Sequence, residues 1–226
     1  MGRKNLLYAL AVKISQVSLN HPVRVGIDGV DASGKTRFAD DLAQAIQAVS
    51  DRFVIRASID DFHQPRAIRL ANGDDSPEGY YQRAFDLDSV KNLLLHPLGP
   101  GGDLKIKRAV FDYRTDKPIV SDWQIVARHS VLIMDGVFLH RSELRGFWDW
   151  SIFLHVPFDV TIQRAILRDG DLFGQEDQIR QRYDQKYIPA QKMYLQWENP
   201  SDKATVVIDN SDFDEPVVIQ TKWQVL

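Results

Sequence analysis

The sequence predicts an α/β fold, in which a mainly parallel, doubly wound sheet carries helices on both faces. Short apolar runs rich in Val, Ile and Leu recur along the chain, as is typical of strands that are buried on both faces. Segments with helical spacing of apolar residues separate these runs, and this alternation is typical of a parallel sheet. No repeat, low-complexity tract or linker interrupts the 226 residues. We therefore expect a single domain over 1–226.

In the first half of the chain, the expected elements are a helix over 5–19, a strand over 23–27, a helix over 36–49 and a strand over 52–58. Residues 60–102 are polar and punctuated by Pro and Gly. We expect loops there, folded over the site at the end of the sheet, with one short helix at 87–95.

In the second half, the expected elements are a strand or strand pair over 105–112, strands over 130–136 and 150–156, a helix over 157–169, a helical stretch over 175–195, a last core strand over 204–210 and an edge strand at 217–220. Pro157 suits the first turn of its helix because the missing N–H is not needed there. Pro189 lies inside the helical stretch 175–195, and we expect it to kink or break that helix.

The composition is that of an ordinary soluble protein, with 44% hydrophobic and 26% charged residues. A net charge of −3 argues against a mainly electrostatic nucleic-acid binder. The chain has no cysteine, which excludes disulfides and thiolate chemistry. No apolar stretch reaches membrane-spanning length. We expect a cytoplasmic protein without nucleic-acid or membrane partners, and the sequence leaves a homo-oligomer open.

The segment VRVGIDGVDASGKT has the spacing of a phosphate-binding loop between a strand and a helix. Its glycines allow a tight turn that directs backbone N–H groups at phosphate oxygens. Lys35 supplies a positive charge for the phosphates, and the Thr36 hydroxyl is a magnesium ligand in such loops. A glycine-rich turn without a ligand is the alternative. The candidate nucleotide-binding residues are Gly29, Asp31, Ala32, Ser33, Gly34, Lys35, Thr36 and Arg37.

Three acidic residues follow predicted strands, at the end of the sheet where α/β proteins bind ligands. Asp135 suits a magnesium ligand, and the alternative is a cap of a turn or helix. Asp60 suits a general base that takes a proton from an attacking hydroxyl, although Asp60-Asp61 also precedes a loop and can serve the turn. Asp28 precedes the first loop glycine, and we expect it to accept backbone N–H bonds there.

Arg164 and Arg168 are four residues apart on the helix expected over 157–169, so they share one face. Like charges at this spacing repel each other, and a polyanion between them would remove the repulsion. Arginine can also bind phosphate oxygens with two parallel hydrogen bonds. A solvated basic face explains the spacing equally well.

Several ordered motifs resemble the uridine kinase / phosphoribulokinase family of small-molecule kinases. The loop DGVDASGKT is similar to that family's phosphate loop, and SIDDFH to its Ser-x-Asp-x-Phe-Tyr. AFD and FDYRT resemble segments that bind ribose and pack against the base, while VLIMDG and ILRD resemble its strand-acid-Gly and lid helix. The match runs from residue 23 to about residue 212 and implies the fold of P-loop nucleoside triphosphate hydrolases and nucleoside kinases.

The resemblance implies a catalytic base at Asp60, a ribose contact at Asp86 and a base contact at Phe111. Lys35 and Arg168 are expected to act on the transferring phosphate, and Arg164 to bind phosphate from the lid. Arg114 is a further substrate-binding candidate. The resemblance divides the domain into a substrate-binding loop region of about 60–116 and a lid of about 161–188.

The resemblance thus implies an ATP- and Mg²⁺-dependent kinase that phosphorylates a small alcohol, foremost the 5′-hydroxyl of uridine or cytidine. Two departures concern the substrate and the lid: segment 170–174 replaces an Arg-Gly-Arg lid sequence, and the family's pyrimidine-binding His is replaced near Asp116. Another acceptor (pantothenate, a sugar or glycerate) and a nucleotide-gated binding protein without transferase activity are the alternatives. The sequence leaves open ATP against GTP, and Asp60 against Asp61 as the base.

Overall fold

The computed structural model describes residues 2–71, 73, 76–173 and 175–222, without the side chains of 169–173. Its main sheet has the order β10-β9-β8-β1-β7-β2. The strands are β1 (Val23–Gly29), β2 (Val54–Ser58), β7 (Val131–Gly136), β8 (Trp150–His155), β9 (Val206–Asp209) and β10 (Val217–Thr221). All neighbours pair in parallel except β10, which is antiparallel to β9. The parallel, doubly wound sheet and its edge strand are therefore confirmed.

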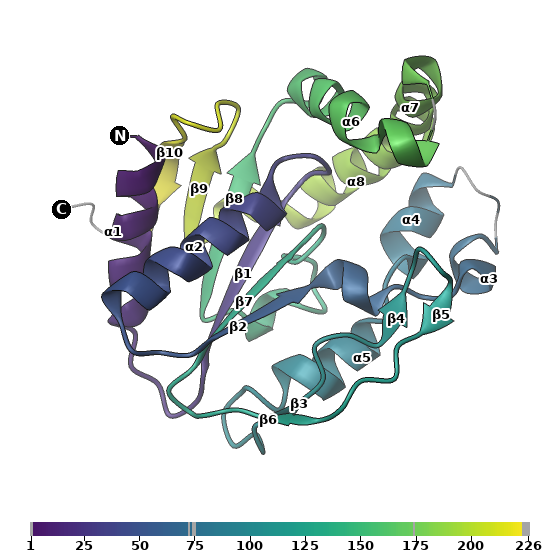
Figure 1. The fold of residues 1–226 in the computed structure, drawn as a ribbon. Coiled ribbons are helices and arrows are strands. Elements are labelled where there is room, and N and C mark those ends of the chain that lie inside the picture. Colours follow the sequence, from purple (N-terminus) through teal and green to yellow (C-terminus); the bar gives the residue numbers. More distant parts are fainter. Residues whose placement is uncertain (1, 72, 74–75, 174, 223–226) are drawn as a thin grey trace.

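Both faces of the sheet are covered by helices, and each face has its own core (Figure 1). Alternate residues of a strand point to opposite faces. Ile133 therefore packs on the side of α1 (Arg3–Ser15) and α2 (Lys35–Val49), whereas Met134 packs on the opposite side. This two-sided burial explains why β7 opens with an uninterrupted apolar run over residues 131–134.

The segment between β2 and β7 contains short helices and two small ribbons. The helical pieces are a 3₁₀ turn at Ile59–Phe62, α3 (Arg66–Arg69), α4 (Pro77–Arg83), α5 (Leu87–Val90) and a π-helical turn at Lys91–Leu95. The ribbons pair β3 (Lys105–Ile106) with β6 (Gln124–Ile125) and β4 (Phe111–Asp112) with β5 (Lys117–Pro118). The expected helix at 87–95 is confirmed as α5 and the π turn. The strand or strand pair expected over 105–112 is confirmed only in part. Two short strands, β3 and β4, lie in this range, but each pairs with a later segment of the chain and not with the other.

The chain leaves β8 into α6 (Phe158–Phe173) and α7 (Glu176–Arg182), which lie beyond the carboxyl end of the sheet (Figure 1). A π-helical turn at Tyr183–Tyr187 leads into α8 (Ile188–Glu198), and α9 (Pro200–Lys203) follows. Pro189 lies in the first turn of α8, directly after the π turn, where its missing N–H costs least. The α-helical pattern is therefore interrupted at the place that Pro189 predicts.

The remaining described helical turn is the 3₁₀ turn Arg145–Phe147. Among the helices that the structure describes, none combines the length and the apolar character needed to cross a membrane.

Candidate active site

The phosphate-loop motif lies between β1 and α2, as its sequence context predicts. Gly34 caps the N-terminus of α2 with a left-handed φ of 89°, a conformation that favours glycine. A Cβ at Gly34 would lie 2.5 Å from the Phe213 ring, and one at Gly29 would lie 2.7 Å from the Leu154 carbonyl oxygen. A side chain is therefore disfavoured at both positions, at Gly29 by the backbone of β8 and at Gly34 by the Phe213 side chain. The free N–H groups at the start of α2 face this loop, which is the usual arrangement for binding an anion.

Lys35 is the first residue of α2, and its side chain bends back over the loop. Its Nζ donates a hydrogen bond to the Val30 carbonyl oxygen at 2.8 Å. Burial lowers the pKa of Lys35, while the nearby carboxylates of Asp31, Asp28, Asp135 and Asp60 act in the opposite direction. The Lys35 ammonium group thus lies near several carboxylates at the phosphate loop, where it can contact an anionic ligand.

Thr36 and Asp135 meet at the start of α2, where the sequence predicts the metal ligands. The Thr36 hydroxyl donates to Asp135 Oδ2 at 2.7 Å, and Arg56 Nη2 donates to the other oxygen, Oδ1, at 2.9 Å. These two oxygen ligands fit Mg²⁺, which typically takes one or two protein oxygens and completes its shell with phosphate and water. In the described part of the chain no group of three acidic or histidine side chains forms an all-protein metal site.

Asp60 lies in the 3₁₀ turn that follows β2, with its backbone N–H bonded to Ser58 Oγ at 3.3 Å. Solvent reaches the side chain, yet protein surrounds it on most sides. The loss of hydration, and next the charge of Asp31, raise its pKa to about 6. Lys35 lowers the pKa of Asp60 and Asp60 raises that of Lys35, so the two groups share one electrostatic site. Burial raises the pKa of the neighbouring Asp61 as well.

Three aromatic rings form a wall beside Asp60. His63 Nδ1 lies 2.8 Å from the Asp60 carbonyl oxygen. Because a carbonyl oxygen can only accept a hydrogen bond, Nδ1 carries the proton and donates it. The His63 ring lies 4.6 Å from Phe85 and 4.8 Å from Tyr113, centroid to centroid. Burial lowers the pKa of His63 to about 4, so the ring is neutral near pH 7. The wall is aromatic and uncharged near pH 7, and it adjoins the turn that carries the candidate base.

The other substrate-binding candidates, Asp86, Phe111 and Arg114, differ in their exposure and in their contacts. Asp86 caps α5, and both of its carboxylate oxygens accept bonds from Ser89, at 3.0 Å from the backbone N–H and 2.7 Å from the hydroxyl. Phe111 is buried in β4. Arg114 is exposed, and its guanidinium lies over the Tyr113 ring at 5.7 Å. Arg114 is therefore beside the aromatic wall, Asp86 caps a helix and Phe111 is buried. The assignment of all three as substrate contacts stays a prediction.

The two arginines of the expected lid, Arg164 and Arg168, contact different parts of the structure. Arg164 Nη2 donates to the carbonyl oxygens of Asn210 and Ser211 at 2.8 Å, and its guanidinium lies 3.6 Å from the centre of the Phe213 ring. Arg37 approaches the same ring at 5.3 Å. Arg168 Nη2 is 3.5 Å from the Tyr183 hydroxyl. The two arginines share a helix face as expected, but Arg164 contacts the β9–β10 loop and Arg168 contacts the π turn. The expected lid tip at 170–174 lies outside the described side chains.

Sequence reasoning missed several side chains of this site. Of these side chains, Arg56 could most readily be predicted from the sequence. It lies on β2, next to β7, and β7 carries its partner Asp135. Asp28 accepts the Gly29 N–H at 2.7 Å as expected, but it also contacts His140 and Tyr194. Asp31 contacts Tyr80 and Gln191. No local pattern marks these partners, since they are distant in sequence.

Known proteins of one kinase family are similar to this chain. A family model described as the phosphoribulokinase / uridine kinase family matches residues 24–209. The uridine kinase of Leuconostoc citreum (strain KM20) is 26% identical over 196 residues, covering 83% of this chain and 86% of its own length. Uridine-cytidine kinase A of Dictyostelium discoideum is 29% identical over 159 residues; the match covers 69% of this chain but only 30% of that protein.

A solved structure of a possible uridine kinase from Bacillus stearothermophilus superimposes with a TM-score of 0.70 at 24% identity. The match covers 91% of this chain and 96% of that one, and it supports the fold. The family match spans the phosphate loop, the Asp60 turn, Asp135, the lid helix and the last parallel strand. The chain therefore belongs to the phosphoribulokinase / uridine kinase family, whose members are ATP-dependent phosphotransferases that act on alcohol groups.

Proposed function

We propose that this protein transfers the γ-phosphoryl group of ATP to the 5′-hydroxyl of a pyrimidine nucleoside, uridine or cytidine. The observation that carries the proposal is the shared electrostatic site of Lys35 and Asp60. One group suits the charge of a transferring phosphate and the other suits the proton of an attacking hydroxyl. Phosphoryl transfer depends mainly on positioning and on neutralising charge, and these two groups supply both.

On the donor side, the loop between Gly29 and Thr36 would hold the phosphates with its backbone N–H groups. Lys35 would leave the Val30 carbonyl oxygen and contact the β- and γ-phosphates. Thr36 and Asp135 would hold a magnesium ion, which supplies charge neutralisation between the phosphates when bound. Arg168 and Arg164 would approach the phosphates when the lid helix α6 moves.

On the acceptor side, Asp60 would accept the proton of the attacking hydroxyl at a carboxylate oxygen. Its raised pKa of about 6 keeps it ionised at neutral pH while strengthening it as a base. His63 and Tyr113 are half-buried and offer aromatic faces on which a planar base can stack, while the buried Phe85 packs against His63. The names of the relatives, uridine kinase and uridine-cytidine kinase, support the same class of acceptor.

A panel of acceptors with γ-labelled ATP and Mg²⁺ tests this proposal. The panel holds uridine, cytidine, a purine nucleoside, pantothenate, a hexose and glycerate, and the labelled product of each is quantified. We expect label in uridine or cytidine at a rate at least tenfold above the other acceptors. Label in a different alcohol would overturn the nucleoside assignment and keep the kinase assignment. Release of inorganic phosphate alone, with every acceptor, would favour a nucleotide-gated binding protein.

A further inference from the structure

Two carboxylates flank the start of the phosphate loop, and both are held by side chains from outside the loop. Asp28 is the penultimate residue of β1, and Asp31 is the third residue of the loop motif that starts at Gly29. Negative charges so close to a triphosphate repel it unless other groups hold them in fixed positions. The partners of these two carboxylates are therefore informative.

The Asp28 carboxylate is fully buried and accepts four hydrogen bonds. The Gly29 N–H donates to Oδ1 at 2.7 Å. The His140 N–H at 3.0 Å, the His140 ring Nδ1 at 2.7 Å and the Tyr194 hydroxyl all donate to Oδ2. Because the first of these bonds comes from the loop itself, the orientation of Asp28 determines the orientation of the Gly29 peptide. Tyr194 is likewise almost completely buried, on helix α8.

Asp31 is held by the same helix. Its Oδ2 accepts hydrogen bonds from Gln191 Nε2 and from the Tyr80 hydroxyl, the latter at 3.1 Å. Its backbone N–H donates to Gln191 Oε1 at 3.2 Å. The Gln191 amide therefore binds both the backbone and the side chain of one loop residue. Gln191 is 1% exposed, so water does not compete for these bonds.

Gln191 and Tyr194 are three residues apart on α8, so they share one face of the helix. The opposite end of α8 is held independently, since Glu198 accepts bonds from the Tyr81 hydroxyl at 3.2 Å and from Arg145 at 3.0 Å. We propose that α8 positions the phosphate loop for the nucleotide through Gln191 and Tyr194, each of which holds one flanking carboxylate. These two are positioning residues, and the inference rests on the proposed function for the nucleotide itself.

Two single variants test this inference. Gln191→Ala removes both bonds to Asp31, and Tyr194→Phe removes only the hydroxyl that holds Asp28. Calorimetry measures the Kd for MgATP, and ¹⁵N–¹H spectra follow the amide signals of Gly29 and Gly34. We expect each variant to raise Kd roughly five- to thirtyfold, the change that follows from losing one buried hydrogen bond to a charged group. We expect Tyr194→Phe to move the Gly29 signal.

Two matched variants on the same structure separate positioning from stability. Tyr81→Phe also removes a buried tyrosine–carboxylate bond to α8, that to Glu198, and it does not contact the loop. Gln196→Ala changes an exposed glutamine of α8. We expect Tyr81→Phe to lower Tm by about as much as Tyr194→Phe, roughly 2–6 °C. We expect both controls to keep the wild-type Kd and the wild-type signals of Gly29 and Gly34.

The inference is overturned if Gln191→Ala and Tyr194→Phe keep the wild-type Kd and leave the loop signals in place, whatever their Tm. It is also overturned if Tyr81→Phe weakens binding as much as Tyr194→Phe does. A wild-type protein that does not bind MgATP would refute the proposed function instead. In that case the Gly29 and Gly34 signals alone decide whether α8 positions the loop, and unchanged signals in both variants refute it.

Discussion

At the scale of single residues, the most direct prediction concerns the rate of phosphoryl transfer after Lys35 is replaced. Replacing it with Ala removes a cation of the phosphate loop that lies near four carboxylates, those of Asp28, Asp31, Asp60 and Asp135. We expect the rate of transfer to fall by on the order of a hundredfold or more, because one preorganised group that stabilises transition-state charge contributes about this much. The circular dichroism spectrum and Tm should stay close to wild type, since the side chain makes only one hydrogen bond, to Val30. Transfer at the wild-type rate would contradict the role of the loop.

Asp60→Asn tests the base, with Asp61→Asn as its matched control. The amide is nearly isosteric but cannot accept the proton of the attacking hydroxyl. We expect kcat to fall by about a hundredfold or more in Asp60→Asn, with little change in the Kd for ATP. Asp61→Asn should keep most of the activity. The reverse order of the two variants would make Asp61 the base, and a change confined to KM would make Asp60 a binding residue.

The pKa of Asp60 predicts the acidic limb of the pH profile. A base must be ionised to act, and the pKa of Asp60 is raised to about 6. We therefore expect kcat/KM to fall as pH drops through about 6, with a plateau above pH 7. His63 does not contribute to this limb, because its pKa is lowered to about 4. A limb centred near pH 4, where an ordinary carboxyl titrates, would show that the base has no raised pKa.

The same shift predicts a change in stability. The folded-state pKa of Asp60, about 6, is higher than the ordinary value of 3.8, so the folded protein binds more protons than the unfolded chain between these values. The free energy of unfolding therefore falls as pH rises through this window. Asp60→Asn removes the unfavourable charge, and we expect its Tm to exceed that of wild type at pH 7.5 and to match it near pH 4. Scanning fluorimetry at both pH values measures this, and an Asn variant with a lower Tm at pH 7.5 would contradict the account.

The candidate site residues could be predicted from the sequence where they lie within one short segment with a recognisable pattern. The phosphate loop has a fixed spacing, and Asp60 and Asp135 each follow a strand whose end is predictable. Gln191, Tyr194 and Tyr80 could not be predicted, because their partners Asp31 and Asp28 are far away along the chain. The substrate contact expected of Asp86 stays a prediction, and its carboxylate accepts two bonds from Ser89.

At the scale of elements, prediction succeeded where burial is two-sided. The strands β1, β7, β8 and β9 are rich in apolar residues because helices cover both faces of the sheet. The ribbons β3–β6 and β4–β5 are only two residues long on each side, too short to have a hydrophobic period. The left-handed Asp116 between β4 and β5 is a property of the turn, and no periodic pattern reports it.

At the scale of elements, the testable prediction concerns α6, the helix of the expected lid. Its small core joins Ala165 to Ala32 of the phosphate loop and to Ile179 and Tyr183, apart from the two main cores. We expect amide exchange across 161–175 to slow when a non-hydrolysable ATP analogue and the acceptor bind, as lids commonly close on their ligands. Arg168→Ala should lower kcat. Unchanged exchange, together with full kcat in Arg168→Ala, would make α6 a solvated helix without a lid function.

At the scale of the whole molecule, the order of the sheet explains why the site lies where it does. β1 lies between β7 and β8, and β2 flanks β7, so Asp28, Asp60 and Asp135 meet at one end of the sheet. Parallel sheets with helices on both faces bind ligands at this end, so the general location could be predicted. The acceptor could not, because its surroundings come from short turns and ribbons between residues 59 and 126, whose contacts depend on the complete fold.

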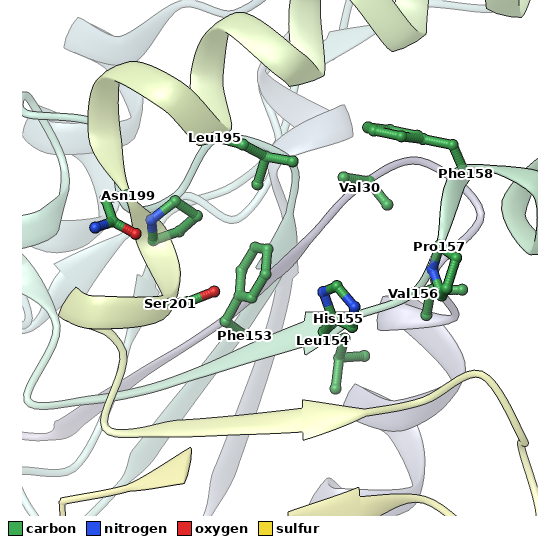
Figure 2. Close-up of a pocket in the computed structure, with 11 residues that line it drawn as sticks. Val30, Phe153, Leu154, His155, Val156, Pro157, Phe158, Leu195, Asn199 and Ser201 are labelled. Atoms are coloured by element: carbon green, nitrogen blue, oxygen red, sulfur yellow. The ribbon is translucent and has the colours of Figure 1, made fainter. Parts of the chain in front are cut away.

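A cavity of about 280 Å³ lies beside Val30 of the phosphate loop (Figure 2). Val30, the end of β8 and the α8–α9 junction line it, mostly with apolar side chains such as Phe153, Phe158 and Leu195. It contains none of Lys35, Asp60 or Asp135, so we assign it no part in phosphoryl transfer.

The identity of the product tests the central claim most directly. Wild-type protein and Lys35→Ala are incubated with uridine, MgATP and no other acceptor, and ³¹P spectra with mass spectrometry identify any phosphorylated nucleoside. The account predicts uridine 5′-monophosphate and ADP in equal amounts with the wild-type protein, and almost no product with Lys35→Ala. Inorganic phosphate and ADP without a nucleotide product, or equal product from both proteins, would contradict it.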